Sequence, residues 1–277
     1  MKDIRIAAAI SRSGAGDVCG NFEKMTQMVR WARQAGADLI CFPEMNLTGY
    51  SSASEISAVA ETVPGPISQD LLRLAETEKI AVLAGMAEKD TDSDRLFITH
   101  LAALPQGGLH VYRKLHIAPP EQGTFSAGNT VPLVEFQGLK FGIQLCYDAH
   151  FPELSTLMAQ KGADLILIPH ASPRGTPAEK YRSWLRHLPA RAFDNSLFVV
   201  ACNQTGETRK GLHFPGIALA LDPSGNVIAK DLSDREGMVI ADLKADALDR
   251  VRNHKMRFFL PNRRPRLYER EQQDHVS

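Results

Sequence analysis

A cysteine, a glutamate and a lysine stand at the ends of short apolar runs, where their side chains could do chemistry. Cys146 follows residues 140–145 (KFGIQL) and precedes Pro152, a residue suited to the first turn of a helix. The cysteine therefore occupies a sharp turn from strand to helix. Such a turn exposes a side chain, aims a helix N-terminus at it and lowers its thiol pKa, as a nucleophile requires. The alternative is a buried core cysteine, which is our interpretation of Cys41 and Cys202 inside their apolar strands.

Glu44 and Lys114 are weaker signals when each is taken alone. Glu44 comes directly after an apolar run that ends at Pro43, a residue that ends strand pairing. A carboxylate at the carboxyl end of a strand points into the crevice where open α/β sheets bind ligands. Lys114 ends another short apolar stretch, and we expect its neighbour Arg113 to be the solvated member of the pair. The alternatives are a solvated loop glutamate and a surface lysine.

The elements that must position these side chains alternate between strands and helices. Short apolar runs predict strands at residues 4–10, 38–42, 80–85, 97–104, 131–136, 140–145, 164–168, 197–201, 217–221 and 238–242. Helical periodicity predicts helices at residues 22–34, 67–78, 152–160 and 178–194, the last of them bent at Pro189. This alternation indicates an α/β protein. No linker divides the sequence, so we expect a single domain over residues 1–277, with residues 250–277 as a C-terminal tail.

One segment occurs twice in similar form. Residues 36–43 (GADLICFP) and 162–169 (GADLILIP) each follow an amphipathic helix. Each glycine is typical of a helix C-cap, and each following run is typical of a buried strand. The repeat predicts two similar halves, each built around a unit of helix and then strand.

Composition excludes several classes of partner. Lysine plus arginine (32) equals aspartate plus glutamate (32), so no overall charge favours nucleic acid or an anionic membrane. The four cysteines are widely spaced, unlike those of a zinc site or a disulfide framework, which favours a reducing cytoplasm. The apolar run near the N-terminus is too short for a signal sequence or a membrane span. We therefore expect a cytoplasmic protein that acts on a small molecule.

Several blocks together resemble the nitrilase superfamily of carbon–nitrogen hydrolases, over nearly the whole chain. The blocks are residues 42–45 (FPEM), 112–116 (YRKLH), 142–148 (GIQLCYD), 151–153 (FPE), 190–195 (ARAFDN) and 263–268 (RRPRLY). The resemblance implies a four-layer α-β-β-α sandwich. It also implies that Cys146 is the nucleophile and that Glu121 matches a second glutamate, which holds Lys114 and the substrate amide. C-terminal tails in this superfamily often pack across subunits, so the tail is expected at a subunit interface of a homodimer or higher homo-oligomer.

The roles that this resemblance implies meet the needs of amide hydrolysis. Glu44 accepts the thiol proton, protonates the departing ammonia or amine, and activates the water that hydrolyses the thioester. Lys114 stabilises the tetrahedral oxyanion together with the backbone N–H of Tyr147. We expect Tyr50, Tyr147, His150 and His170 to bind the substrate, and we expect no metal and no cofactor.

Two departures from the superfamily pattern bear on the substrate. Many of its amidases have arginine four residues after the nucleophile, where His150 stands here. An acidic substrate is therefore not expected unless Arg174 or another loop cation replaces that arginine. Ile217 stands where a serine often follows the glycine of its block. True nitrilases usually have tryptophan and glutamate after the cysteine, whereas Tyr147 and Asp148 follow here, which favours amide or carbamoyl hydrolysis over nitrile hydrolysis.

Other functions are weighed against this one. Cys146 could form a protease-like pair with a histidine near a strand end: His116, His150, His170 or His213. That pair explains neither Glu44 nor Lys114. A zinc site of Cys146 and His150 lacks further ligands at a recognisable spacing. A catalytically silent interaction protein on the same scaffold, or a basic C-terminal segment that binds nucleic acid, are the remaining alternatives. The segment's interspersed aromatic residues favour a docked interface instead.

Overall fold

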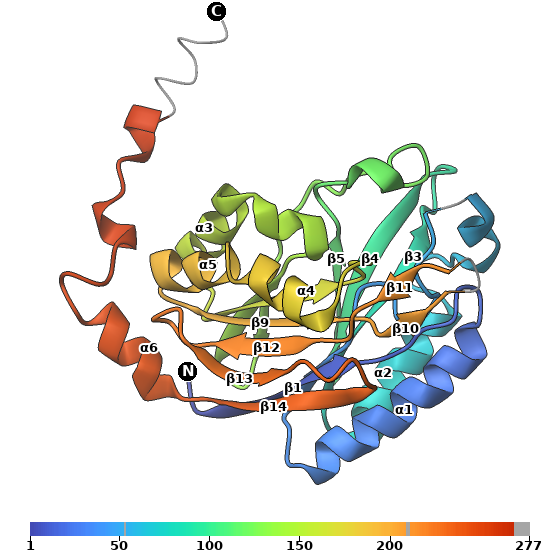
Figure 1. Cartoon of the computed structure of the whole chain (residues 1–277), viewed down its shortest axis with the longest axis horizontal. Helices are drawn as coiled ribbons and strands as arrows, with labels where there is room; N and C mark the ends of the chain where they lie inside the picture. Colours follow the sequence, from blue (N-terminus) through green and yellow to red (C-terminus); the bar gives the residue numbers. More distant parts are fainter. Residues whose placement is uncertain (53, 209–210, 269–277) are drawn as a thin grey trace, which may run out of the picture.

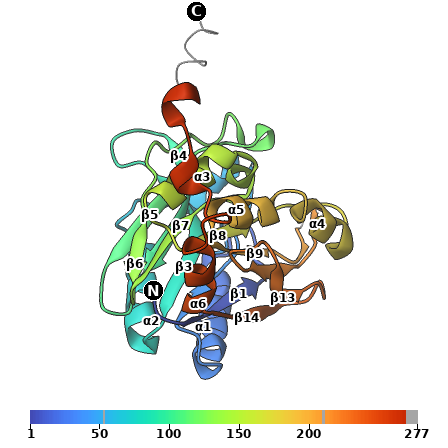
Figure 2. The same cartoon turned by 90° about the vertical axis from the view of Figure 1, so that its left-hand side faces the viewer.

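Two six-stranded sheets and the helices outside them form four layers (Figure 1). The computed structural model describes residues 1–52, 54–208 and 211–268. Helices α1 (Val18–Gln34) and α2 (Pro66–Glu78) cover the first sheet, and α3 (Pro152–Gln160) and α5 (Leu188–Asn195) cover the second. The view turned by 90° keeps these two pairs of helices apart in the same way (Figure 2). The predicted α-β-β-α sandwich is confirmed.

The first sheet has the strand order β14-β1-β2-β3-β4-β5. Its strands are β1 (Ile4–Ile10), β2 (Leu39–Cys41), β3 (Ala81–Lys89), β4 (Leu96–Ala103), β5 (Leu109–Arg113) and β14 (Gly237–Leu243). The three strands β1, β2 and β3 are parallel, and the other neighbours pair antiparallel. The middle strands are buried on both faces, which explains their continuous apolar sequence.

The second sheet repeats this arrangement with the strand order β13-β12-β9-β8-β7-β6. Its strands are β6 (Val134–Phe136), β7 (Leu139–Ile143), β8 (Leu165–His170), β9 (Phe198–Asn203), β12 (Ala218–Leu221) and β13 (Val227–Asp231). Here β7, β8 and β9 are parallel, with antiparallel strands on either side. Read from β14 in the first sheet and from β6 in the second, the two sheets thus have the same order of antiparallel and parallel neighbours.

The repeated segment makes the same hydrogen bonds in both sheets. In the first, Asp38 N–H donates to the oxygen of Arg5 at 2.8 Å, and Asp38 Oδ2 accepts from Arg5 N–H at 2.9 Å. In the second, Asp164 N–H donates to the oxygen of Lys140 at 2.7 Å, and Asp164 Oδ2 accepts from Lys140 N–H at 3.1 Å. The glycine before each strand has positive φ, as a helix C-cap requires. The prediction of two similar halves is therefore confirmed.

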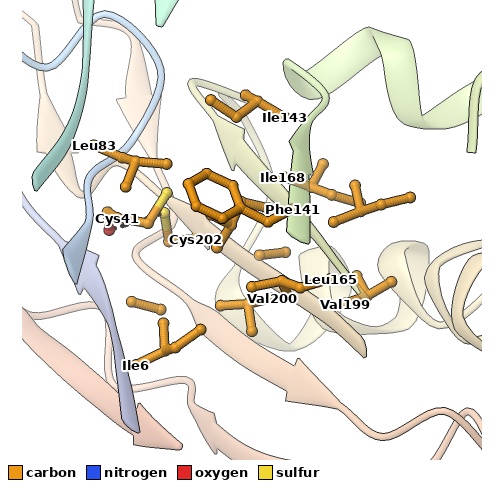
Figure 3. Packing of buried hydrophobic residues seen from close by; sticks show 14 of the residues in the cluster. Ile6, Cys41, Leu83, Phe141, Ile143, Leu165, Ile168, Val199, Val200 and Cys202 are labelled. Atoms are coloured by element: carbon orange, nitrogen blue, oxygen red, sulfur yellow. Dashed lines mark hydrogen bonds between the residues drawn. The ribbon is translucent and has the colours of Figure 1, made fainter. Parts of the chain in front are cut away.

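Buried side chains from both sheets fill the space between them (Figure 3). Ile6 and Leu83 of the first sheet and Phe141 and Val200 of the second belong to one cluster. Burial of such side chains contributes about 1.5–3 kcal/mol each. Cys41 and Cys202 are both 1% exposed in this layer, so their assignment as core cysteines is confirmed.

Shorter elements complete the chain. They are helices α4 (Pro177–Trp184) and α6 (Ala245–Arg252), strands β10 (Gly206–Glu207) and β11 (His213–Phe214), and the 3-10 helices η1 (Ser54–Val59), η2 (Pro119–Glu121), η3 (Cys146–His150) and η4 (Leu260–Asn262). Within the described residues, no helix combines the length and the apolar character needed to span a bilayer. Residues 269–277, the last part of the expected tail, lie outside the described residues.

Three features differ from the sequence prediction. The segment 178–194 is wrong as a single bent helix, because the chain leaves the helix after Trp184 and His187 caps a second one. Pro189 lies in the first turn of that second helix, where its missing N–H costs nothing. Strands β5 and β13, which lack a continuous apolar run, were not predicted. Helix α6, before and within the expected tail, was not predicted either.

Candidate active site

Glu44 lies in the turn that follows β2 and is completely buried. Its Oε2 accepts a hydrogen bond from the N–H of Ala171 at 3.1 Å, and its backbone oxygen accepts one from Gln204 Nε2 at 3.0 Å. Both donors follow strands of the second sheet, β8 and β9. The carboxylate is therefore held between the two halves, and a solvated loop glutamate is excluded.

Lys114 lies between two carboxylates directly after β5. Its Nζ donates to Glu44 Oε1 at 2.8 Å and to the two carboxylate oxygens of Glu121 at 2.9 and 2.8 Å. The lysine side chain is 0% exposed, so it is not a surface residue. A buried ammonium is tolerated when it is paired in this way. One positive charge faces two negative charges, which leaves an excess of negative charge in a buried space.

This imbalance governs the proton affinity of Glu44. Burial raises its pKa, Lys114 opposes the rise, and repulsion by Glu121 adds to it, with a result of about 7. Burial alone lowers the pKa of Lys114, but Glu44, Cys146 and Glu121 outweigh it and raise the pKa above its usual range. The lysine thus stays charged near neutral pH while the carboxyl can exchange a proton.

Glu121 ends the 3-10 helix η2 and is itself held from several sides. Its Oε2 accepts a hydrogen bond from the N–H of Ala118 at 3.0 Å. Its Oε1 accepts one from the hydroxyl of Tyr50 at 3.1 Å. Burial raises the pKa of Tyr50, with the nearby carboxylates adding to the rise, so the phenol keeps its proton and donates. Tyr50 is therefore linked to Lys114 through Glu121.

Cys146 occupies the turn between β7 and α3 that its neighbours predicted. It begins η3 with a φ of 47°, in the left-handed region that costs a non-glycine residue about 1–3 kcal/mol. The residue stays partly accessible, and its thiol is within electrostatic reach of Glu44 and Lys114. The two sheets thus bring the predicted cysteine, glutamate and lysine together.

The expectation of a lowered thiol pKa is wrong. Burial raises the pKa of Cys146 above its usual range, Glu44 adds to the rise, and Lys114 only partly opposes it. Helix α3 begins at Pro152, so η3 separates the thiol from the helix N-terminus. A thiol of this kind is protonated at rest and needs a base to become a nucleophile. Glu44 is the carboxylate with a suitable pKa.

Asp148 connects the turn of Cys146 to the strand that leads to Lys114. Its Oδ2 accepts hydrogen bonds from the N–H of Leu145 at 3.0 Å and from the hydroxyl of Tyr112 at 2.8 Å. Its Oδ1 accepts from the N–H of His116 at 2.8 Å. These donors flank Cys146 on one side and Lys114 on the other. Asp148, which is completely buried, therefore fixes Cys146 relative to Lys114.

The remaining expected binding residues, Tyr147, His150 and His170, differ in burial. Tyr147 is partly buried, with its ring 5.8 Å from that of the exposed His150. His170 is buried against Trp184, and its Nδ1 donates to the oxygen of Ile168 at 2.8 Å. Burial lowers the pKa of His150 and of His170, so both rings are neutral near pH 7. Ile217 is fully buried beside β12, and nothing in the structure shows what a serine there would change.

The alternative sites have little in the structure to support them. Cys146 makes no hydrogen bond to a histidine in the described part of the chain. His116 instead pairs with Asp148 at 2.8 Å, and His213 lies 3.3 Å from Asp234. Across residues 1–52, 54–208 and 211–268, no group of three or more His, Cys, Asp and Glu side chains could hold a metal ion.

Two residues of the site were not singled out from the sequence. Asp148 was noted only as a neighbour of the nucleophile, although a carboxylate two residues after Cys146 was a visible signal. Lys180, on α4, is half-buried and within electrostatic reach of Cys146. A lysine in a predicted helix is usually at the surface, so the sequence offered no signal for it.

Known proteins resemble the chain over most of its length. The family model described as carbon-nitrogen hydrolase matches residues 5–253. An (R)-stereoselective amidase of Pseudomonas sp. is 32% identical over 240 residues, which cover 86% of this chain and 84% of that protein.

Solved structures share the fold. A carbon–nitrogen hydrolase superfamily protein of Xanthomonas campestris, solved with an arsenic adduct in its active site, has a TM-score of 0.84 and 25% identity. The match covers 95% of this chain and 98% of that one. An amidase of Nesterenkonia sp. AN1, 24% identical, has a TM-score of 0.82 with 96% of both chains covered, and a mutant of it carries the acetamide moiety of fluoroacetamide on its active-site cysteine.

Proposed function

The chain belongs to the carbon–nitrogen hydrolase family, and from this premise we propose that it hydrolyses a small amide or carbamoyl compound through a thioester on Cys146. One observation carries the proposal. A buried lysine lies between two carboxylates, Glu44 and Glu121, within electrostatic reach of a thiol on a strained turn. The family acts on carbon–nitrogen bonds other than peptide bonds, and the amidases among its relatives support the choice of an amide.

In the first half-reaction, Glu44 takes the proton of Cys146 as sulfur attacks the carbonyl carbon. A carbon–sulfur bond forms, and the carbonyl oxygen becomes an oxyanion. When the tetrahedral intermediate collapses, the carbon–nitrogen bond breaks and Glu44 gives its proton to the leaving nitrogen, which departs as ammonia or amine. A pKa near 7 suits Glu44 to both directions of this transfer near neutral pH.

In the second half-reaction, water replaces the nitrogen. Glu44 removes a proton from the water as its oxygen attacks the thioester, and it returns that proton to the sulfur as the carbon–sulfur bond breaks. The products are a carboxylic or carbamic acid and the free thiol of Cys146. Each cycle thus returns Glu44 and Cys146 to their starting protonation states.

Lys114 and the backbone N–H of Tyr147 stabilise the oxyanion in both half-reactions. A fixed donor is effective because it needs no reorganisation when charge develops. Glu121 holds Lys114 by two hydrogen bonds and Tyr50 by one, and it orients the substrate amide. Tyr50, Tyr147, His150 and His170 bind the substrate, a proposal supported for Tyr50 by its hydrogen bond to Glu121.

We also propose that the protein works in the cytoplasm as a homodimer or higher homo-oligomer, with the tail at the interface. Support comes from the exposed apolar side chains of Met256, Phe259 and Tyr268, on a segment that extends away from the sheets (Figure 1). Light scattering of the full chain and of a chain ending at residue 253 tests this. A full chain that is monomeric at micromolar concentration contradicts it.

The function is tested by ammonia release from a panel of small amides, carbamoyl compounds and nitriles. We expect turnover of amides or carbamoyl compounds, and a fall of at least about 10⁴-fold in kcat for Cys146→Ala. Cys19→Ala, which alters an exposed cysteine far from the site in the chain, serves as the matched control and keeps its rate. Equal activity in a folded Cys146→Ala protein removes the nucleophile assignment, and release from nitriles alone makes the protein a nitrilase.

A further inference from the structure

Lys180 reaches the site from the second sheet's side, on helix α4. Its Nζ donates to Ser172 Oγ at 2.8 Å and to the oxygen of Pro173 at 3.2 Å. The segment that holds it begins at Ala171, whose N–H donates to Glu44. The Lys180 ammonium is therefore bound to Ser172, the residue next to Ala171, which donates a hydrogen bond to the proposed base Glu44.

The anchoring segment is itself fixed. Asn203 Oδ1 accepts a hydrogen bond from the N–H of Ser172 at 2.8 Å, and Asn203 Nδ2 donates to the oxygen of Ser172 at 3.0 Å. The same Nδ2 donates to the oxygen of Pro215 at 2.8 Å. Lys180 thus has a defined position before any substrate arrives, which is what a binding group needs.

Within the described residues, Lys180 has no carboxylate at ion-pair distance. The neighbouring Glu179 turns away to cap its own helix, where Oε2 accepts from the N–H and the hydroxyl of Thr176. Burial lowers the pKa of Lys180, and a thiolate on Cys146 opposes the fall. A half-buried ammonium whose bonds go only to neutral oxygens is costly for the fold unless a ligand supplies the negative charge.

Two lysines, Lys114 and Lys180, are within electrostatic reach of Cys146, and they differ in charge balance. Lys114 is neutralised by Glu44 and Glu121. Lys180 acts electrostatically on Cys146 and, among the described residues, forms no ion pair with Glu44 or Glu121. An ammonium has three donors, and Ser172 and Pro173 take two of them. One N–H and one positive charge remain to face a substrate held on the sulfur.

We propose that Lys180 binds a carboxylate of the substrate, so that the enzyme selects short amides or carbamoyl compounds that carry a second, anionic group. The inference rests on the proposed function of Cys146. A carboxylate matches a single remaining donor better than a phosphate, which takes several. The histidines nearby do not supply the charge, because burial lowers the pKa of His150, His170 and His187. Arg174 does not supply the charge either, because it is an exposed residue.

The proposal changes the expectation drawn from His150. Its neutral ring led us to expect no acidic substrate unless a loop cation replaced the family's arginine. Lys180 supplies a cation from helix α4 rather than from a loop. Arg191, the other half-buried cation nearby, interacts with His150 and His187 rather than with Cys146.

Hydrolysis of a matched pair of amides gives the first test. Succinamate carries a carboxylate where butyramide has a methyl group, and the two are otherwise alike. We expect a preference for succinamate that falls about 10- to 100-fold in kcat/KM in Lys180→Gln, which removes the charge but keeps a donor for Ser172. Butyramide should change less than about 3-fold, and Lys180→Arg should retain the preference. Arg174→Met, a cation lost from the adjoining loop, should leave both rates unchanged.

Alkylation of Cys146 gives a second test that needs no turnover. Iodoacetate carries a carboxylate where iodoacetamide has a neutral amide. We expect the ratio of their alkylation rates at Cys146 to fall about 10-fold in Lys180→Gln and to stay unchanged in Arg174→Met. An equal fall with both reagents, or an equal loss for both amides, overturns the proposal and gives Lys180 a role in activating the thiol or holding the loop. If no amide is hydrolysed but the ratio of alkylation rates still changes in Lys180→Gln, the proposed function is refuted and the carboxylate-binding site is retained.

Discussion

Two adjacent cations, Arg113 and Lys114, form clusters of opposite character. Arg113 donates to Glu88 through two nitrogens at 2.6 and 3.0 Å and lies 3.6 Å from Asp90. Arg95 pairs with Asp90 as well, so two guanidiniums face two carboxylates. Lys114 alone faces two carboxylates and has no exposed side-chain surface, whereas the Arg113 side chain is 34% exposed.

The difference separates a structural cluster from a reactive one. Where two guanidiniums meet two carboxylates, the charges balance and the cluster only stabilises the fold. Where one ammonium must serve two buried carboxylates, the pKa of Glu44 rises to about 7 and its proton becomes available for chemistry. Successive side chains along a strand point to opposite faces, so the neighbours Arg113 and Lys114 lie in these different surroundings.

Lys114→Met should show the largest effect. Methionine keeps most of the stem and removes the charge that we propose stabilises the oxyanion, so kcat should fall by at least about 100-fold. Steady-state kinetics on the best amide of the panel measure this. A rise in KM alone would make Lys114 a substrate anchor instead.

Arg113→Met is its matched control in the neighbouring cluster. Since Arg113 touches none of Glu44, Glu121 or Cys146, kcat should stay within about 3-fold of the unmodified enzyme. A loss of activity like that of Lys114→Met in a folded protein would break the distinction between the clusters.

The pH dependence of kcat/KM should follow the ionisation of Glu44. The base must be ionised, so activity should fall about 10-fold per pH unit below pH 7 and level off above it. Glu121→Gln removes a charge that raises this pKa, so the acidic limb of the profile should move to lower pH.

Asp90→Asn provides the corresponding control for the pH profile. It removes a carboxylate from the balanced cluster and should leave the limb in place. A limb that moves equally in both variants would show that the profile does not report Glu44.

The smallest expected effect is on stability. Arg113→Met leaves Glu88, whose side chain is 2% exposed, without its cation and should lower the free energy of unfolding by about 1–3 kcal/mol. Urea unfolding followed by circular dichroism measures the change. Unaltered stability would mean that Thr99, which also donates to Glu88, is sufficient to hold that carboxylate.

The sequence was sufficient for the strands that are buried on both faces. The mainly apolar segments 4–10 and 164–168 predicted two of these strands, and the repeated segment predicted the two similar halves. Strands β5 and β13 lie at the edges of their sheets and have at most one fully buried residue each, so they lack the apolar run that predicts a strand. The break after Trp184 was missed because apolar spacing continues across it to Leu188.

The sequence was sufficient to predict which residues form the site, but not the burial and the charges around them. Blocks around Glu44, Lys114 and Cys146 identified the three side chains in their order along the chain. The pKa of Cys146 was predicted in the wrong direction, because it depends on burial between two sheets that the local turn does not encode. Lys180 was missed for the same reason, since the side of α4 that faces Cys146 is decided by packing.

The pairing of β1 with β14 has a consequence for how the protein is made. Ile4 lies opposite Leu243, so the first strand acquires its outer neighbour only after nearly the whole sandwich has been synthesised. At about 5–20 residues per second, the delay on the ribosome is roughly ten to fifty seconds. During that time one edge of β1 has unpaired N–H and C=O groups, which are a template for aggregation. Pairing with residues 237–243 removes this exposed edge, so we expect β14 to protect the chain from aggregation only at the end of synthesis.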